Sequence, residues 1–367
     1  MWADRSPGRS ALARTPRRYP AESVSSLDAA FRAIGEGVDN GRLPSGVLAI
    51  ANARGLVRLE AFGPVATDSI FLIASITKPI FATGLLRLVE RGRVLLNDRI
   101  ADFLPRFAAN GKQDVRLWHL LTHTSGLDET LLVPINRVTI WSEMLERACD
   151  AVLLFPPGTR YNYCNASFLV MAELVEQLTG QRHFEYLRDV VLEPLGMHHT
   201  AYIPPESPRV VAVHTPPWPD DAGREKWIGM RHPGAGLWST AEDLVRFGRA
   251  LLLGGELDGY RVVSPAMLRV MTSRQTAGIP NVTGAGTFES YYGLGFGKSG
   301  PWSDNGPSVE LQTPEGFGHG GATGTYLWID PALDLVFVFL TNGWGIDEPY
   351  LKRALNAAVA SASGGLG

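Results

Sequence analysis

The stretch 325–342, TYLWIDPALDLVFVFLTN, predicts two strands joined by a tight turn, because two apolar runs flank an Asp-Pro turn signal. The stretch 45–63, SGVLAIANARGLVRLEAFG, has the same form around the turn sequence NARG. Segments with apolar residues at helical spacing lie outside the two hairpins, at 25–41 and 349–362. We expect strands from both ends of the chain to pair in one antiparallel sheet that the terminal helices cover.

The middle of the chain has a different character, with helical segments joined by long connections that contain proline and glycine. The clearest of these helices are expected at 75–94, 166–180 and 239–255. The last begins at Ser239 and has Glu242 three residues later, which is the spacing of a capping box. This pattern predicts a mostly helical portion inserted between the two halves of a sheet.

The expected organisation is therefore α+β, with a central antiparallel sheet and an inserted helical domain. We expect a flexible basic tail at 1–24, a sheet domain formed by 25–90 together with 235–367, and a mostly helical domain at 91–234.

Composition restricts the function classes. The chain has 367 residues, 45% of them hydrophobic, and a formal net charge of -3. A sizeable core is therefore expected, and affinity for nucleic acid or for an anionic membrane is not. Cys149 and Cys164 suggest no disulfide framework, and no apolar run has the length of a signal peptide or of a membrane span. A small-molecule substrate and a cytoplasmic location are the expectations.

Ser75 and Lys78 form a Ser-x-x-Lys pair in a chain with only five lysines. Residues i and i+3 share one face of a helix, so Oγ and Nζ can come within hydrogen-bonding distance. A lysine with a pKa of about 10.4 cannot act as a base near neutral pH, but burial would lower that pKa. The apolar neighbours that could bury it are Ile73, Ile76, Ile80 and Phe81. An isolated motif of this kind is also compatible with an N-cap serine followed by a solvated lysine.

Other candidate catalytic groups are weaker. The chain has no Gly-x-Ser-x-Gly nucleophile elbow. His119 and His123 lack the acidic residue of the zinc motif His-Glu-x-x-His, so local hydrogen bonding is the expected role of both, and no metal site is predicted.

Two further motifs accompany the serine and the lysine. Tyr163, Cys164 and Asn165 follow a Pro-Gly turn and precede a helix, and a Gly-rich turn at 317–325 precedes a strand. Ser-x-x-Lys, Tyr-x-Asn and His-Gly-Gly in this order resemble the penicillin-recognising serine hydrolases. The closest resemblance is to the class C β-lactamase-like branch, which includes family VIII carboxylesterases, D-alanyl-D-alanine carboxypeptidases and D-aminopeptidases. It extends from about residue 25 to the C-terminus and implies a β-lactamase/DD-peptidase-like fold.

The resemblance implies a role for each matching residue. Ser75 would be the acylated nucleophile, Lys78 its proton acceptor and Tyr163 the phenol that protonates the leaving group and later helps to activate water. Asn165 would hold the lysine and contact the substrate, and it could also cap the following helix. Tyr161 is an alternative phenol if the alignment is shifted by two residues. Cys164 is expected to be a small buried side chain.

The third motif departs from the Lys-Thr-Gly of β-lactamases. The resemblance implies an oxyanion hole formed by the backbone N–H groups of Ser75 and Ala322, with His319, Gly320 and Gly321 at the substrate. Glycine supplies no hydroxyl for a substrate carboxylate, and histidine can be neutral at pH 7. An ester requires neither group.

The expected function is thus that of a carboxylesterase for short-chain acyl esters, without metal or organic cofactor. The alternatives are a β-lactamase, a D-aminopeptidase or DD-peptidase-like amidase, an acyltransferase, and a binding protein without turnover. Substrate preference is expected to depend on the loops 128–140, 202–232 and 275–290.

Overall fold

The computed structural model describes residues 25–128, 141–216, 218, 220–283, 286–300, 309–345 and 349–366. The predicted tail at 1–24 and most of the predicted loop 128–140 lie outside these residues.

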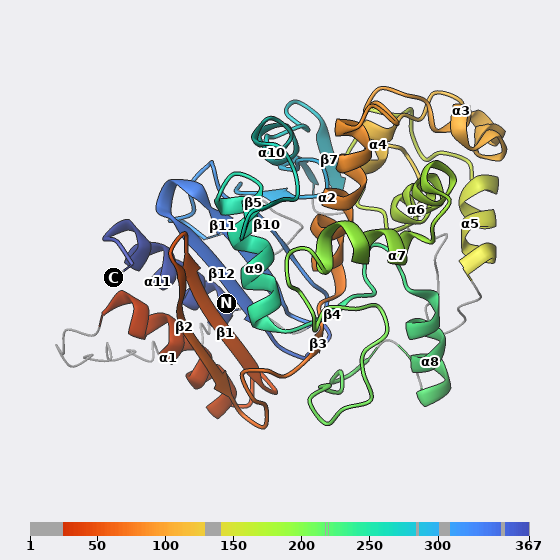
Figure 1. Ribbon diagram of the computed structural model, residues 1–367. Coiled ribbons are helices and arrows are strands. Elements are labelled where there is room, and N and C mark those ends of the chain that lie inside the picture. The colour runs from red at the N-terminus through yellow and green to blue at the C-terminus, as the bar shows by residue number, and fades with distance from the viewer. Residues whose placement is uncertain are drawn as a thin grey trace, which may run out of the picture.

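A six-stranded antiparallel sheet in the order β2-β1-β12-β11-β10-β9 forms the centre of the fold (Figure 1). Both predicted hairpins are present, and β1 pairs with β12, so the two ends of the chain meet in one sheet as expected. The strands are Gly46–Asn52 (β1), Gly55–Phe62 (β2), Gly297–Lys298 (β9), Phe317–Gly320 (β10), Tyr326–Asp330 (β11) and Leu335–Leu340 (β12).

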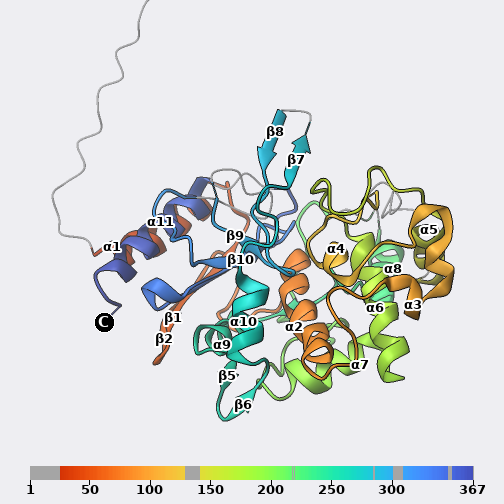
Figure 2. The ribbon, with the colours of Figure 1, turned by 90° about the horizontal axis from the view of Figure 1, so that it is seen from above.

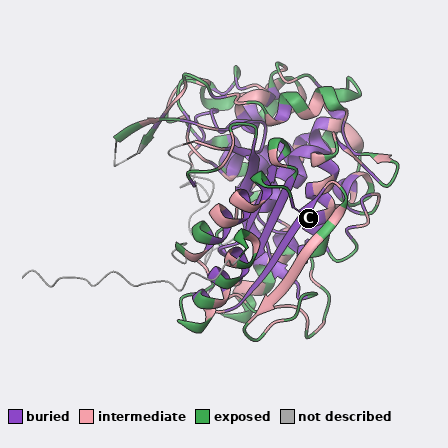
Figure 3. Ribbon diagram, turned by 90° about the vertical axis from the view of Figure 1, so that its left-hand side faces the viewer, coloured by how far each residue is buried: buried purple, intermediate pink, exposed green. Residues whose placement is uncertain are grey.

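Both faces of the sheet are covered. Every residue of β1 and β12 is buried, whereas the edge strand β2 is mostly half-buried (Figure 3). Alternate residues point to opposite faces of a strand, so Phe337 packs with the terminal helices and Val338 with the central core. The terminal helices α1 (Ser26–Asp39) and α11 (Pro349–Ser363) cover one face, and α9 (Ala241–Leu252) covers the other (Figure 1).

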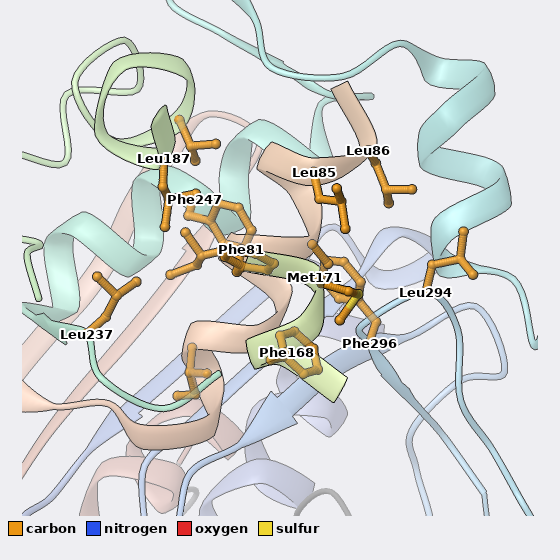
Figure 4. Packing of buried hydrophobic residues seen from close by; sticks show 14 of the residues in the cluster. Phe81, Leu85, Leu86, Phe168, Met171, Leu187, Leu237, Phe247, Leu294 and Phe296 are labelled. Atoms are coloured by element: carbon orange, nitrogen blue, oxygen red, sulfur yellow. The ribbon is translucent and has the colours of Figure 1, made fainter. Parts of the chain in front are cut away.

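The larger core cluster combines residues of the sheet with residues of the other helices. Most of these helices lie on the side of the sheet away from α1 and α11 (Figure 2). Phe81 of α2 packs edge-on against Phe168 of α6, with ring centroids 5.8 Å apart, and Leu85 and Met171 lie beside them (Figure 4). The helices are α2 (Thr77–Glu90), α3 (Ile100–Phe103), α4 (Leu117–Leu121), α5 (Trp141–Asp150), α6 (Ala166–Thr179), α7 (His183–Leu187), α8 (Asp221–Met230) and α10 (Pro265–Thr272). Short 3₁₀-helical segments occur at η1 (Ala74–Ile76), at η2 (Pro105–Gly111), which is kinked at Ala109 and Asn110, and at η6 (Pro331–Leu333), and a π-helical turn occurs at η5 (Arg188–Leu192).

Three short strand pairs complete the fold. β3 (Phe71–Leu72) pairs with β4 (Trp238–Ser239), β5 (Glu256–Leu257) with β6 (Tyr260–Arg261), and β7 (Pro280–Thr283) with β8 (Gly286–Glu289). The last pair is a hairpin that projects from the body of the molecule (Figure 2). Of the loops expected to govern specificity, 202–232 therefore contains a helix, and 275–290 contains this hairpin.

The predicted cap of α9 is wrong by one residue. The N-cap is Thr240, whose hydroxyl accepts a hydrogen bond from Asp243 N at 3.3 Å. Ser239 belongs to β4 instead, and its hydroxyl lies 2.8 Å from Thr200 Oγ1. Serine and threonine are both good N-caps, so strand pairing with β3 selects the threonine.

None of the helices in the described part of the chain combines the length and the apolar character needed to cross a membrane.

Gly248 allows α9 to approach the sheet, and we predict that Gly248→Ala destabilises the protein. A Cβ atom there would lie 2.5 Å from Val336 Cγ1, a stiff side chain in a fully buried strand. The cost of overpacking, about 1–3 kcal/mol, outweighs the roughly 0.8–1.0 kcal/mol that alanine gains over glycine within a helix. Free energies of unfolding from urea titration measure the difference.

The matched control is Gly229→Ala in α8, where a Cβ atom meets nothing within 4 Å. This variant should gain stability from helix propensity alone. A gain in both variants would contradict the packing argument.

Candidate active site

Ser75 and Lys78 lie at the junction of η1 and α2, directly after β3. The Lys78 side chain is completely buried, and its Nζ donates a hydrogen bond to Ser75 Oγ at 3.1 Å. The predicted proximity of the two side chains is therefore observed. Pro79 stands in the first turn of α2, where a missing backbone N–H breaks no helical hydrogen bond.

The backbone that carries Ser75 is strained and held from both sides. Ala74 has a φ of +44°, a left-handed conformation that is unfavourable for a residue with a Cβ atom. Before it, Ile73 N donates to Leu237 O at 2.9 Å, and after it Thr77 Oγ1 accepts from Leu237 N at 3.1 Å. The segment around Leu237 thus fixes the turn that presents Ser75.

Lys78 bonds to oxygen atoms that come from different parts of the described chain. In addition to Ser75 Oγ, its Nζ donates to Asn165 Oδ1 at 2.5 Å and to Gly234 O at 2.8 Å. An amide or peptide oxygen can only accept, whereas a hydroxyl can also donate. A neutral Lys78 can therefore keep both N–H bonds and direct its lone pair at the Ser75 hydroxyl. The sequence analysis did not identify Gly234, because its contribution is a backbone carbonyl.

Tyr163 is the phenol at the serine. Its hydroxyl donates to Ser75 Oγ at 2.9 Å, and Lys78 Nζ lies 4.7 Å from the centre of its ring. Tyr161 is buried beside the hairpin, where its backbone N–H donates to Pro280 O, so the geometry favours Tyr163 over the alternative alignment.

The two residues after Tyr163 were expected to have different roles, Asn165 as a partner of the lysine or a helix cap and Cys164 as a buried side chain. Asn165 stands at the N-cap position of α6, but its side chain makes no capping bond and accepts from Lys78 instead. Cys164 is completely buried, as predicted.

The turn after β10 is bonded to the segment that precedes the serine. Thr323 Oγ1 donates to Leu72 O at 2.7 Å, and Thr325 Oγ1 donates to Ile73 O at 3.2 Å. These two bonds bring Ala322 close to the strand that leads to Ser75. The sequence analysis missed both threonines, although their alternation with small residues in GATGT was visible.

Gly321 is the glycine that this turn requires. A Cβ atom at this position would lie 2.5 Å from Ile73 O and 2.2 Å from Thr325 Oγ1. The close approach that Gly321 permits is therefore an approach to the protein's own backbone near Ser75.

His319 is a buried side chain next to this turn and is not an exposed cation. The side chain is only 2% exposed, Nδ1 lies 2.6 Å from Gly320 O, and Nε2 lies 3.1 Å from the Tyr292 hydroxyl. A peptide oxygen only accepts, so Nδ1 carries the proton and the Tyr292 hydroxyl donates to Nε2. Burial, with a smaller contribution from Lys78, lowers the pKa of His319 to about 3.

The other predicted histidines make local contacts. His119 Nδ1 accepts from Arg116 N, and burial lowers the pKa of His119 to about 4. His123 Nδ1 accepts from Cys164 N at 3.1 Å. Within the described residues, no group of three or more His, Cys, Asp and Glu side chains could hold a metal ion.

We predict that the His319 imidazole stays neutral, with its proton on Nδ1, from pH 8 down to pH 5. Its folded pKa lies below the value of about 6.5 expected in the unfolded chain. The unfolded chain therefore binds the extra proton first, and this group lowers stability as the pH falls from about 6.5 towards 3.

Nitrogen NMR of ¹⁵N-histidine-labelled protein measures the tautomer, with the His319 signals assigned by their loss in His319→Asn. The same protein in urea is the control, since its histidines should titrate near about 6.5. Titration of the folded His319 signal near pH 6.5 would contradict the assignment.

Comparisons with known proteins identify the family of the chain. The β-lactamase family model matches residues 30–362. The chain is 32% identical to penicillin-binding protein 4 of Amycolatopsis lactamdurans, over 76% of this chain and 74% of that protein. It is 29% identical to esterase EstB of Burkholderia gladioli, over 81% and 83%. The structure of a penicillin-binding protein homologue from Caulobacter crescentus superposes with a TM-score of 0.78 at 25% identity, over 92% and 97%. The chain is a serine hydrolase of the β-lactamase family, with the α+β fold of that family.

Proposed function

We propose that this hydrolase is a carboxylesterase of the family VIII type that cleaves short-chain acyl esters through an acyl-enzyme on Ser75. The observation that carries the proposal has two parts. Ser75 is hydrogen-bonded to two groups that can transfer protons, and the neighbouring His-Gly-Gly motif offers a substrate carboxylate neither a hydroxyl nor a charge. Tyr163 and Lys78 both bond to Ser75 Oγ, and the neutral ring of His319 lies 6.0 Å from that of Tyr163.

Acylation starts with the transfer of the Ser75 hydroxyl proton to neutral Lys78, which keeps its bonds to Asn165 and Gly234. Oγ attacks the ester carbonyl, and the backbone N–H groups of Ser75 and Ala322 stabilise the oxyanion. Tyr163 then gives its proton to the departing alkoxide and becomes a phenolate beside the Lys78 cation.

Deacylation reverses these transfers. The Tyr163 phenolate takes a proton from water, and the resulting hydroxide attacks the acyl carbon. The Ser75 alkoxide leaves and recovers its proton from Lys78. All three groups then have their starting protonation, so one water is consumed per ester.

The preference for an ester follows from the third motif. A β-lactam or a peptide C-terminus carries a carboxylate, whose hydrogen bonds to a site contribute roughly 1.5–3 kcal/mol each. His319 is buried with both ring nitrogens engaged, and Gly320 has no side chain. An ester needs no such anchor, and its alkoxide leaves more readily than an amine. The similarity to esterase EstB supports this reading.

A hydrolase of β-lactams or of D-alanyl peptides is the second candidate. It is favoured by the similarity to penicillin-binding protein 4 over three quarters of the chain. The D-aminopeptidase and acyltransferase alternatives share the same groups at Ser75 and differ in leaving group and acceptor.

We predict that wild type hydrolyses p-nitrophenyl butyrate with a kcat/KM at least about 100-fold above that for nitrocefin, the factor that one or two missing carboxylate contacts imply. Ser75→Ala should lose about 10³-fold or more of the ester activity. Absorbance assays of both substrates with both proteins give the comparison. Faster turnover of nitrocefin than of the ester would move the assignment to β-lactamase.

Gly321→Ala should lower kcat for p-nitrophenyl butyrate by about 10²–10³-fold, the usual cost of losing one oxyanion donor. The added Cβ would push the 321–325 turn away from Ile73 and so displace the Ala322 N–H from the serine. Steady-state kinetics measure the loss, and Gly229→Ala is the glycine control outside the site. Full activity in Gly321→Ala would rule out this turn as part of the oxyanion hole.

A further inference from the structure

His123 is a buried histidine that the proposed mechanism does not use. It follows α4 by two residues and is completely buried. Its φ of +57° is in the left-handed region, which side chains rarely adopt although histidine is enriched there. A position of this kind needs an explanation beyond filling space.

Two hydrogen bonds connect His123 to the backbone N–H groups of the residues immediately before and after Tyr163. Asn162 N donates to His123 O at 2.8 Å, and Cys164 N donates to His123 Nδ1 at 3.1 Å. One residue, His123, therefore accepts hydrogen bonds from the backbone on both sides of the phenol.

The ring of His123 also packs directly against the phenol. The centroids of His123 and Tyr163 are 4.4 Å apart, with the planes inclined by 34°. Other aromatic rings surround the imidazole, with centroids at 5.0 Å for Tyr292, 5.8 Å for Phe168 and 5.9 Å for Tyr161. The surrounding rings thus restrict the orientation of the imidazole, and the imidazole in turn restricts the orientation of the Tyr163 ring.

The hydrogen bonding requires a neutral imidazole. Because Nδ1 accepts from Cys164 N, the ring proton is on Nε2, an atom that has no partner among the described residues. Burial, with contributions from Lys78 and His319, holds the pKa of His123 well below its usual range. A phenylalanine would fill the same space without a buried unpaired N–H, so the acceptor at Nδ1 is the property that distinguishes histidine here.

We propose that His123 is a positioning residue for catalysis, which holds the Tyr163 hydroxyl at Ser75 Oγ so that it can protonate the leaving alkoxide. The proposal rests on the ester hydrolysis proposed above. Tyr163 lies in the segment between α5 and α6, outside both helices. A displacement of about 1 Å of a reacting group can cost on the order of 10²-fold in rate, which makes such a clamp necessary.

Three substitutions separate the acceptor from the ring. His123→Asn keeps an acceptor, since Oδ1 is as many bonds from the backbone as Nδ1, and asparagine tolerates a positive φ. His123→Phe keeps a ring without an acceptor. His123→Gly has neither but suits the left-handed backbone, so it provides the comparison if the phenylalanine variant does not fold.

The measurement is the ratio of kcat/KM for ethyl butyrate to kcat/KM for p-nitrophenyl butyrate. The two esters share one acyl group, but only the ethoxide needs a proton from Tyr163 to leave. The ratio also cancels the fraction of folded enzyme, which a merely structural role would change for both substrates equally. Tyr163→Phe defines the full loss.

We expect the ratio to fall about 10-fold or more in His123→Phe and His123→Gly, as in Tyr163→Phe, and to stay within about threefold of wild type in His123→Asn. Equal losses on both esters in the phenylalanine and glycine variants, or no loss, would overturn the positioning role. An asparagine variant as defective as the glycine variant would overturn the role of the Nδ1 acceptor.

If wild type hydrolyses neither ester, the proposed function itself fails, and crystal structures of His123→Gly and His123→Asn then test the clamp without any ester. Movement of the Tyr163 hydroxyl away from Ser75 Oγ in His123→Gly, absent in His123→Asn, would support the clamp. The wild-type position of Tyr163 in both variants would overturn it.

Discussion

The burial of Lys78 is the constraint on which the rest of the site depends. A completely buried lysine needs oxygen partners, and these come from Ser75, Asn165 and Gly234, three points widely separated in the sequence. The helix that carries the lysine, the loop before α6 and the segment near Gly234 must therefore meet at one atom. Two of the partners are obligatory acceptors, which leaves the third direction for the serine. The polar requirement of one side chain thus fixes the geometry of the reaction centre.

A second set of contacts fixes the backbone on either side of Ser75. Thr323 and Thr325 bond the turn after β10 to the backbone before Ser75, and Leu237 holds that backbone from the other side. Each of these contacts involves at least one backbone atom, and together they hold a strained residue, Ala74, immediately beside the serine. Strain at such a point persists only when several independent bonds determine the conformation. Most of the precision of the site comes from residues that would not touch a substrate.

The third motif shows how a local substitution changes the chemistry without changing the fold. His319 occupies the strand position of the lysine in the Lys-Thr-Gly motif of β-lactamases, and its neutral imidazole is bonded to Tyr292 and to Gly320 O. The turn after this strand is bonded to Leu72 O and Ile73 O by the hydroxyls of Thr323 and Thr325. A neutral, buried imidazole offers no charge to a substrate carboxylate, and the acylation of Ser75 proposed above does not require such a charge.

The sequence by itself predicted the sheet-forming hairpins, the terminal helices and the proximity of Ser75 and Lys78, whereas Tyr163 was assigned from the resemblance. Local periodicity and motif spacing depend only on residues close together in the chain. It also carried the resemblance that the family match bears out. Only the tertiary structure decided that Gly234 O binds the lysine, that Thr240 rather than Ser239 caps α9, and that His319 is buried and neutral. These outcomes depend on backbone carbonyls, strand pairing and burial, and no side-chain pattern encodes such long-range contacts.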